Sequence, residues 1–526
     1  MGSRMPSLSR RGPTSHTEHA PAPPRDALAA VVFWLVGVVV GLHLLLFLYY
    51  SWRFVLFPYQ VDYGEGPILQ IALRVAHGQT MYPPMTQGPP YVIASYMPLY
   101  YVLSAATLLV TGPSFLGGRL LAFLSAVVIA LCCGLYVQRS TGRRFPAFIA
   151  GAMVLAMPIM MVWASLMRTD VVALAFSVAG FYLFYRERRI AGVILLALAV
   201  LTRWTNVAAI AAAISILVFQ RRWKEAAIWA AISGALCVAL VLGANALTHG
   251  MMMAQLSLHT SSSLGKSWTW QQVWLLLSIA GREWPVYFVL GAIGAVWCAI
   301  RPAHRPVAVY FAAAWAVFFT SGRIGSTFNY LMEPLAAGAM AFGILWAEWE
   351  QVDPKAAGGR LRALARPAVV ACAGVLALQM VYTTLNRRLE HAIEILRPKA
   401  SGAASAYVVE RIREASGPVL CEDVGLNVLA GKEAPLDPFE FTQMAHKRAF
   451  DPTPVYDDVR AGKFPLIVLR FDPEKTGPDR DTGDWGAGRW PEGIIEGVRE
   501  RYQLVQEAEP YLLYVPKREE GRGKGE

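Results

Sequence analysis

The sequence is poor in charged residues. Lys, Arg, Asp and Glu make up 16% of its 526 residues, whereas soluble globular domains carry about 25%. Hydrophobic residues reach 55%, and the mean hydropathy is +0.39. This composition excludes an ordinary soluble enzyme. The chain is also longer than the about 100 to 200 residues usual for one domain, so we expect at least two parts.

Cysteine and acidic residues are scarce as well. Five of the six cysteines lie within apolar runs, and only Cys421 lies in the polar C-terminal region. This distribution excludes a disulfide framework and a metal site of the CxxC type. The 48 Lys and Arg residues outnumber the 37 Asp and Glu residues, but the Arg residues form short clusters between apolar runs rather than one basic face. We therefore expect no nucleic-acid partner.

Eleven apolar runs occupy most of the first three quarters of the chain. The first, residues 28–50, is long enough to cross a hydrocarbon layer of about 30 Å and lacks a small-residue cleavage site, so we interpret it as an uncleaved span. The two runs that flank Arg203 are short, which indicates tilted or kinked halves of a hairpin. The other ten predicted spans are residues 119–137, 147–165, 171–185, 190–202, 205–219, 226–247, 285–300, 307–320, 329–346 and 367–385.

The Arg clusters set the expected orientation. Four Arg residues precede the first span, and cytoplasmic loops are rich in Lys and Arg, so the N-terminus is predicted to lie in the cytoplasm of a plasma (inner) membrane. We favour a helix on the outer surface for residues 96–110, because this run is short and begins with Tyr residues. The later Arg clusters then also fall on the cytoplasmic side. If residues 96–110 cross instead, most of the first half inverts.

Four regions follow from these patterns. Residues 1–26, rich in Pro, Ser, Arg and His, are predicted to be a disordered cytoplasmic tail. Residues 27–385 form the membrane domain, with a first outer loop at about 51–95. Residues 386–516 are predicted to be a small α/β domain outside the cytoplasm, and residues 517–526 a second disordered tail. The strands expected in this domain are residues 418–421, 465–471 and 511–515, with helical stretches such as residues 404–415.

Two carboxylates follow the first predicted span. Asp62 and Glu65 occur in VDYGEG, and two acids three positions apart can share a proton, a metal ion or an acceptor hydroxyl. Gly64 and Gly66 would let a ligand approach the backbone closely. The alternative is that both acids only begin an interfacial helix and complement its dipole. Asp170, in MRTD, is either a helix N-cap or a further acid on the same face.

Basic residues border the same outer loops. Arg203 interrupts an uncharged stretch beside Trp204, where its guanidinium group either grips a phosphate or extends from a short helix end to the membrane surface. Arg168 opens the run that carries Asp170. Charged residues near membrane depth are candidates for function by default.

Two later segments add weaker candidates. Arg323 and Tyr330 border a span in SGRIGSTFNYLMEP. His259 and Lys266 lie in a long outer loop whose Ser, Trp and Met content is typical of an interfacial helix and a mobile lid. The simpler interpretation of these two is that they are solvated loop residues; the functional one is contact with an acceptor.

The order of these motifs resembles the GT-C class of membrane glycosyltransferases, specifically bacterial family 39-like enzymes related to protein O-mannosyltransferases and to the aminoarabinose transferase of lipid A. The resemblance covers about residues 33–346. It implies an α-helical polytopic membrane protein of about 11 transmembrane helices with a small extracytoplasmic α/β domain. The motifs that carry it are VDYGEG, YPP, YMPLYYVLSA, GGRLLAFLSAVV, MRTDVVALAFSVAGFYLF, LAVLTRWTN and GRIGSTFNYLMEP.

The resemblance implies a reaction. An inverting enzyme of this class moves a sugar from a polyprenyl-phosphate donor to a lipid, glycan or protein acceptor at the outer face of the membrane. Asp62 matches the catalytic base of the family, Glu65 would orient the acceptor or the base, and Asp170 matches the second acidic position. No cofactor is required, although a divalent cation held by these three acids is an alternative.

The basic residues would then bind the donor phosphate. Arg203 stands where relatives have Lys or Arg near that phosphate, and Arg323 with Tyr330 matches a late basic-aromatic motif. Together with Arg168, these groups would stabilise the charge that develops on the leaving phosphate. The acids of the first loop are separated by Tyr-Gly instead of adjacent, and no MIR-type repeats occur, so protein O-mannosylation is not inferred.

Two other classes of function compete with this interpretation. A transporter or flippase of a lipid-linked or polar solute also places polar residues in its spans. Here, however, the charges gather at one face and inverted repeats are not evident. A scaffold whose outer domain binds a partner would need fewer than eleven spans for anchoring.

Overall fold

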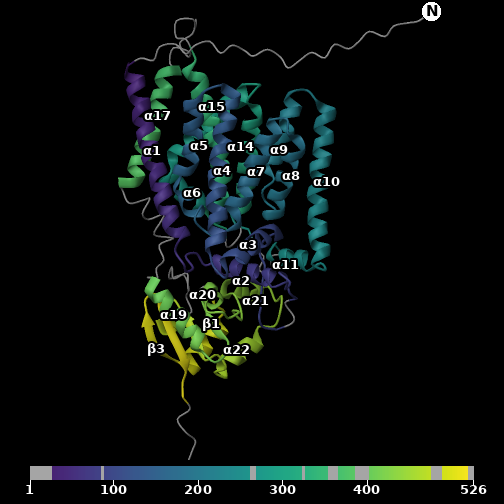
Figure 1. Cartoon of the computed structure of the whole chain (residues 1–526), viewed down its shortest axis with the longest axis vertical. Coiled ribbons are helices and arrows are strands. Elements are labelled where there is room, and N and C mark those ends of the chain that lie inside the picture. Colours follow the sequence, from purple (N-terminus) through teal and green to yellow (C-terminus); the bar gives the residue numbers. More distant parts are fainter. Residues whose placement is uncertain are drawn as a thin grey trace, which may run out of the picture.

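The protein is a tall helical bundle with a small α/β domain at one end (Figure 1). The computed structural model describes residues 27–84, 88–260, 268–322, 326–352, 365–385, 402–475 and 489–518. The predicted tail 1–26 and residues 519–526 of the second tail lie outside this description.

Each predicted span coincides with one or two helices. The helices of the bundle and its loops are α1 (Ala27–Val55), α2 (Glu65–Ala76), α3 (Pro98–Thr111), α4 (Leu116–Thr141), α5 (Arg144–Ala156), α6 (Pro158–Trp163), α7 (Thr169–Tyr185), α8 (Arg189–Thr202), α9 (Ala208–Phe219), α10 (Trp223–Leu247), α11 (Met251–Thr260), α12 (Trp270–Glu283), α13 (Pro285–Ile300), α14 (Arg305–Phe318), η2 (Phe319–Gly322), η3 (Phe328–Leu331), α15 (Met332–Glu350) and α17 (Ala365–Leu385).

Five helices among the described residues, α1, α4, α10, α15 and α17, are long and apolar enough to cross a membrane singly. Helices α12 and α13 meet at an angle of 100° and together form a broken span or a re-entrant element. Shorter apolar helices such as α7, α8 and α9 pack between the long ones. Helix α15 is almost wholly buried and lies at the centre of the bundle. The chain is therefore a multi-pass membrane protein.

One predicted span is divided in two. Residues 147–165 were expected to form a continuous helix, but α5 ends at Ala156 and α6 begins at Pro158, with Met157 extended between them. Proline lacks the backbone N–H that a continuing helix needs, and its ring disfavours a helical residue before it. The predicted hairpin around Arg203 is confirmed, since α8 ends at Thr202 and α9 begins at Ala208.

Helix α3 does not cross the bundle. Ser95, just before it, donates a hydrogen bond of 2.5 Å to Glu440 of the α/β domain. Phe115, just after it, packs against Gly425 of the same domain. Both ends of α3 thus lie on one side of the membrane region, which confirms that residues 96–110 do not cross it.

The first and last helices of the bundle are neighbours. His43 of α1 lies 3.1 Å from the carbonyl oxygen of Met380 and 3.0 Å from the hydroxyl of Thr384, both in α17. Gly402, where the next described helix begins, lies against the ring of Phe57 at the end of α1. The α/β domain therefore starts beside the loop that follows α1.

The α/β domain contains a four-stranded sheet of order β1-β2-β4-β3. Strands β1 (Val419–Cys421) and β2 (Leu466–Leu469) are parallel, whereas β4 (Tyr511–Pro516) runs antiparallel to β2 and to β3 (Tyr502–Ala508). The three predicted strands are confirmed. Strand β3 was not predicted, because it is an exposed edge strand that shows no apolar alternation. The helices of this domain are α19 (Gly402–Glu414), α20 (Val424–Leu429), α21 (Pro438–His446), α22 (Thr453–Arg460) and α23 (Glu492–Arg501), with a short η4 (Pro473–Lys475).

The sheet presents the carboxyl ends of its parallel strands to the bundle. Glu422 and Asp423 follow β1, and Arg470 follows β2. Because the carboxyl ends of parallel strands meet at one edge, these side chains lie together. Asp423 accepts a hydrogen bond from Gln60 of the first outer loop (3.2 Å) and pairs with Arg470 (3.2 Å). The α/β domain thus lies directly on the loop that carries the predicted acids.

Candidate functional site

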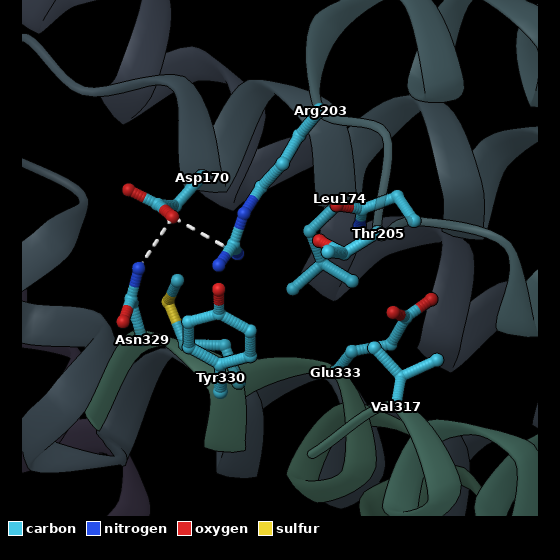
Figure 2. A pocket seen from close by; sticks show the side chains of 10 residues that line it. Asp170, Leu174, Arg203, Thr205, Val317, Asn329, Tyr330 and Glu333 are labelled. Carbon is cyan, nitrogen blue, oxygen red and sulfur yellow. Dashed lines mark hydrogen bonds and ion pairs between the residues drawn. The ribbon is translucent and has the colours of Figure 1, made fainter. Parts of the chain in front are cut away.

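A small polar pocket lies where three helix ends meet (Figure 2). Asp170 is in the first turn of α7, Arg203 follows the last residue of α8, and Tyr330 belongs to η3. All three side chains line the pocket. The residues that line it are Asp170, Leu174, Arg203, Thr205, Asn206, Val317, Asn329, Tyr330, Met332 and Glu333.

Asp170 and Arg203 are the charged pair of this pocket. Asp170 Oδ1 lies 2.9 Å from Arg203 and accepts a hydrogen bond of 2.6 Å from the Asn329 amide. The Arg203 guanidinium lies 4.3 Å from the centre of the Tyr330 ring, within the range of a cation–π contact. Farther from Asp170, Glu333 accepts a hydrogen bond of 3.1 Å from the Tyr310 hydroxyl. Three of the predicted residues thus form one cluster.

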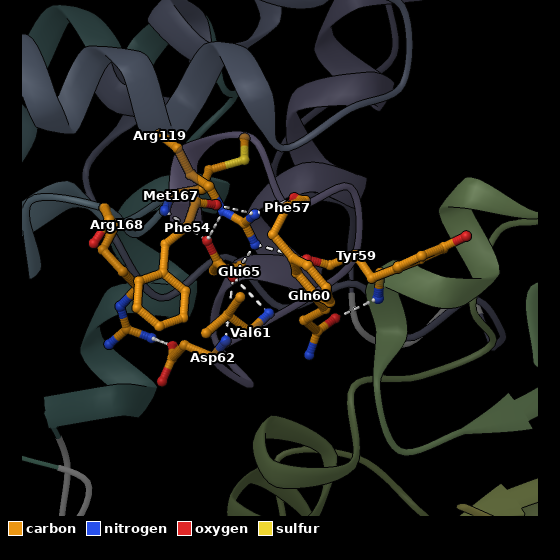
Figure 3. A network of polar contacts seen from close by, with 12 residues as sticks. Phe54, Phe57, Tyr59, Gln60, Val61, Asp62, Glu65, Arg119, Met167 and Arg168 are labelled. Atoms are coloured by element: carbon orange, nitrogen blue, oxygen red, sulfur yellow. Dashed lines mark hydrogen bonds and ion pairs between the residues drawn. The ribbon is translucent and has the colours of Figure 1, made fainter. Parts of the chain in front are cut away.

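The first outer loop is fixed to the bundle by Glu65 and Arg119 (Figure 3). Both side chains are completely buried, and Arg119 bonds both carboxylate oxygens of Glu65, at 2.8 and 2.7 Å. The remaining N–H groups of Arg119 donate to the carbonyl oxygens of Phe54, Phe57 and Tyr59. Arg119 therefore also caps the end of α1, where backbone acceptors lack helical partners.

Glu65 acts on the backbone around Asp62. Its carboxylate accepts hydrogen bonds from the amides of Val61 (2.9 Å), Asp62 (3.2 Å) and Met167 (2.8 Å). Burial disfavours its charge, but Arg119 and these donors outweigh burial and hold the pKa of Glu65 below its usual range. No part of the Glu65 side chain is exposed, and its contacts are with protein groups that include the amide of Asp62.

Asp62 is the accessible acid of the loop, with 22% of its side chain exposed. Its Oδ2 accepts a hydrogen bond from the Gly64 amide (2.9 Å) and pairs with Arg168 (3.0 Å). Burial raises the pKa of Asp62 above its usual range, although Arg168 opposes the shift. A carboxylate with a raised pKa is a better proton acceptor at neutral pH.

Gly64 is required by the close approach of Arg168. A Cβ atom at this position would lie 1.6 Å from one guanidinium nitrogen of Arg168. Gly66 has a similar role toward the α/β domain, since its Cβ would lie 2.4 Å from the backbone nitrogen of Gly425. The groups that approach these two glycines closely in the structure are therefore protein groups, Arg168 and Gly425, whereas the prediction was a ligand.

Four of the predicted residues form one row of alternating charge. Arg168 pairs with Asp62 at 3.0 Å and lies 3.9 Å from Asp170, which pairs with Arg203. The row runs from the first outer loop to the pocket. Arg323 and Lys266 lie outside the described residues, and for His259, in α11, the side chain is not described.

The three predicted acids do not converge on a common point. Arg119 binds both oxygens of Glu65, and Arg168 lies between Asp62 and Asp170. Within the described part of the chain, no group of three or more His, Cys, Asp or Glu residues is placed to hold a metal ion. In this structure each of these three acids is instead paired with an arginine.

Sequence reasoning missed three residues of this region. Arg119 was visible as the one charged residue in GGRLLAFLSAVV, and an isolated charge in an apolar helix was the available signal. Asn329 and Glu333 flank the predicted Tyr330, but neither has a spacing that indicates a site. Their roles depend on contacts with residues far away in the sequence.

The α/β domain bonds to the same loop at several points. Gln60 accepts a hydrogen bond of 2.7 Å from the Gly425 amide, and Gln70 exchanges two hydrogen bonds with the backbone of Ala434. Tyr91 pairs with Leu436 as an isolated parallel bridge. The loop therefore lies between two parts of the protein and is fixed to both.

No family model matches the sequence, and no curated protein matches it either. Solved structures do match. ArnT from Cupriavidus metallidurans in the apo state gives a TM-score of 0.58 at 12% identity, over 92% of this chain and 98% of that chain. The same protein bound to undecaprenyl phosphate gives 0.56 at 15% identity, over 90% and 97%. An oligosaccharyltransferase from Archaeoglobus fulgidus gives 0.47 at 13% identity, over 90% and 71%. The chain has the fold of the GT-C membrane glycosyltransferases.

Proposed function

We propose that the protein is an inverting glycosyltransferase that moves a sugar from a polyprenyl-phosphate donor to an acceptor at the extracytoplasmic face of the membrane. The observation that carries this proposal is the row of alternating charge from Asp62 to Arg203, which joins an accessible acid to an Arg-lined pocket. The GT-C fold supports it, and ArnT, which shares that fold, has been crystallised with undecaprenyl phosphate.

Asp62 is the proposed catalytic base. It would take the proton of the acceptor hydroxyl while the hydroxyl oxygen attacks the anomeric carbon. The bond between that carbon and the phosphate oxygen breaks, and polyprenyl phosphate leaves with the bonding electrons. The raised pKa of Asp62 and its partial exposure suit this role.

Arg203 is the proposed phosphate-binding group. A guanidinium in a site that excludes water stabilises negative charge on a leaving phosphate more strongly than it would in water. Asp170, Asn329 and Tyr330 hold it in place, through the ion pair, the hydrogen bond to Asp170 and the ring contact. Arg168, at the other end of Asp170, would add a further positive charge.

The orientation and the cofactor requirement belong to the same proposal. The Arg clusters favour a cytoplasmic N-terminus in the plasma membrane, so that the α/β domain lies outside the cytoplasm. Because each of the three loop acids is already matched by a guanidinium group, we propose transfer without a divalent cation.

The test is release of polyprenyl phosphate from a panel of polyprenyl-phosphate sugars by purified protein in lipid. Asp62→Asn is compared with wild type and with Asp457→Asn, which removes an exposed carboxylate of α22. We expect Asp62→Asn to lose about 100-fold or more of turnover while it keeps expression and donor binding, and Asp457→Asn to match wild type. Wild-type turnover in Asp62→Asn would remove Asp62 as the base. No release by wild type from any donor, even with cell-envelope extract as acceptor, would overturn the proposal and favour transport.

A further inference from the structure

The aromatic ring between the two loop carboxylates lies under two arginine side chains. Tyr63 follows Asp62, and its ring centre lies 5.7 Å from the guanidinium carbon of Arg168 in the membrane region. The guanidinium carbon of Arg489, in the α/β domain, lies 4.6 Å from the same centre. We call Tyr63, Arg168 and Arg489 the Tyr63 clamp. Two parts of the protein that are far apart in the sequence thus meet on one loop residue.

Arg489 is held in place by its own domain. Its carbonyl oxygen accepts a hydrogen bond of 2.6 Å from Thr442 of α21, and the next residue, Trp490, is completely buried in the domain core. Its guanidinium lies 3.5 Å from the Glu422 carboxylate. The α/β domain therefore presents this side chain toward the loop from a fixed backbone.

The domain also contacts Tyr63 through an apolar group. The ring of Phe439, in the first turn of α21, lies 5.7 Å from the Tyr63 ring in an edge-to-face arrangement. Such aromatic pairs and cation–π contacts both depend on orientation, so they restrict how the Tyr63 ring can turn. Tyr63 is bonded directly to Asp62 in the chain. Contacts that limit the movement of the Tyr63 ring therefore also limit the movement of the segment that carries the Asp62 carboxylate.

We propose that Arg489 is a positioning residue for Asp62, through which the α/β domain completes the active site. The proposal rests on the proposed role of Asp62 as base. Glu65 fixes the backbone amide of Asp62 from the membrane side. Arg489 and Phe439 hold Tyr63 from the side of the α/β domain. Both sets of contacts are needed because the loop lies between two separate parts of the structure.

The charge of Arg489 gives this role a specific signature. The charged groups that act on Asp62 are Arg168, Glu65 and Arg489, and both arginines lower its pKa. Arg489 itself forms an ion pair with Glu422, and its charge also acts on Asp437, Tyr63 and Asp62. Loss of the Arg489 charge leaves the pKa of Asp62 higher. As the pH is lowered, Asp62 then becomes protonated, and can no longer act as a base, at a higher pH than in the wild-type protein.

The test compares Arg489→Gln, Arg489→Lys and Arg413→Gln in the donor-cleavage assay across pH. Arg413 lies on α19 of the same domain with 53% of its side chain exposed, so its variant removes one charge without touching the loop. We expect Arg489→Gln to lower kcat about 10- to 100-fold, to leave the KM for donor unchanged and to move the acid limb of the pH profile upward. Arg489→Lys should restore the limb but only part of kcat, since lysine keeps the charge but not the planar group. Arg413→Gln should match wild type.

A wild-type kcat and pH profile in Arg489→Gln would overturn the proposal, as would a lowered kcat with an unmoved acid limb. If Arg489→Gln does not fold, the variants Tyr63→Leu and Tyr63→Phe test the same contact by changing the ring instead of the arginine. Tyr63→Phe keeps the ring, so Tyr63→Leu should have the lower kcat, and equal values would reject the clamp. Failure of the proposed function is separate, because it appears as full turnover in Asp62→Asn or as no release by wild type, whatever the Arg489 variants do.

Discussion

Arg119 and Glu65 form a two-bond ion pair in which neither side chain has any exposed surface. The pair joins the first turn of α4 to the first residue of α2. Taking two charges out of water is costly, and the pair is retained only while each charge has its partner. The pair fixes the position of the Asp62 loop relative to the bundle.

Removal of Arg119 should therefore destabilise the protein strongly. We expect Arg119→Ala to lower the free energy of unfolding by about 3 to 5 kcal/mol, because Glu65 is left charged and unpaired. Thermal unfolding in detergent would measure the effect. Arg139→Ala, which removes an exposed arginine at the other end of α4, should change stability by less than about 0.5 kcal/mol. Equal stability of the two variants would contradict this view of the pair.

Gly64→Ala should separate Arg168 from Asp62 with little loss of fold. The new Cβ would displace the end of the flexible Arg168 side chain, and the backbone of Gly64 is in a region open to alanine. Without that guanidinium the pKa of Asp62 rises further, so activity should fail at a higher pH as the solution is acidified. Gly234→Ala, in α10, meets no atom within 4 Å and serves as control. An unchanged acid limb in Gly64→Ala would show that Arg168 does not set the pKa of Asp62.

Glu440 should make stability depend on pH in the direction opposite to most carboxylates. Burial raises the pKa of Glu440 from 4.5 to about 7, and burial together with the nearby Glu440 raises the pKa of Asp437 as well. The folded state then binds more protons than the unfolded state between about pH 4.5 and 7, so stability is full below this window and is lost as the pH rises through it.

The variant Glu440→Gln isolates this effect. It should have the wild-type Tm near pH 4.5 and a Tm about 2 °C or more above wild type at pH 8, where the buried charge is removed. Glu410→Gln, on the exposed face of α19, should follow wild type at both pH values. A Tm for Glu440→Gln below wild type at pH 8 would mean that its ionised form is stabilised by partners such as Lys447.

Chelation should leave activity unchanged. Each loop acid is matched by a guanidinium group, and a divalent cation would have to displace Arg168 to reach both Asp62 and Asp170. Turnover with excess chelator, followed by added Mg²⁺ or Mn²⁺, measures this directly. A loss of turnover that added cation restores would require a rearranged site.

The positions of the spans could be predicted because apolar length is a local property. The same holds for the strands β1, β2 and β4, and for the surface position of α3, where Tyr residues and shortness were the signals. Pro158 is recognisable in the sequence as a helix breaker, but the span was drawn from hydropathy, which does not take the backbone effect of proline into account. Strand β3 could not be identified, since it pairs through its backbone and buries little.

The candidate site was predictable in its members but not in its connections. Asp62, Arg168, Asp170 and Arg203 stood out as charges at the ends of apolar runs. Their pairing order depends on contacts that span 106 residues for Asp62 and Arg168. Periodicity and composition say nothing about such contacts, and for the same reason the part taken by Arg489 could not be seen.

The neighbouring positions of α1 and α17 have a consequence for the order of assembly. During synthesis Asp62 is made before α4, and the Glu65–Arg119 pair that fixes its loop can form once α4 has entered the membrane. The contacts with Asp423 and Arg489 must wait until α17 has closed the bundle beside His43 and the α/β domain has followed. If Asp62 is the base, as proposed, an unfinished chain would hold it in a site that lacks the contacts with the α/β domain. Newly made protein would thus leave lipid-linked donors untouched until the α/β domain with Arg489 was in place.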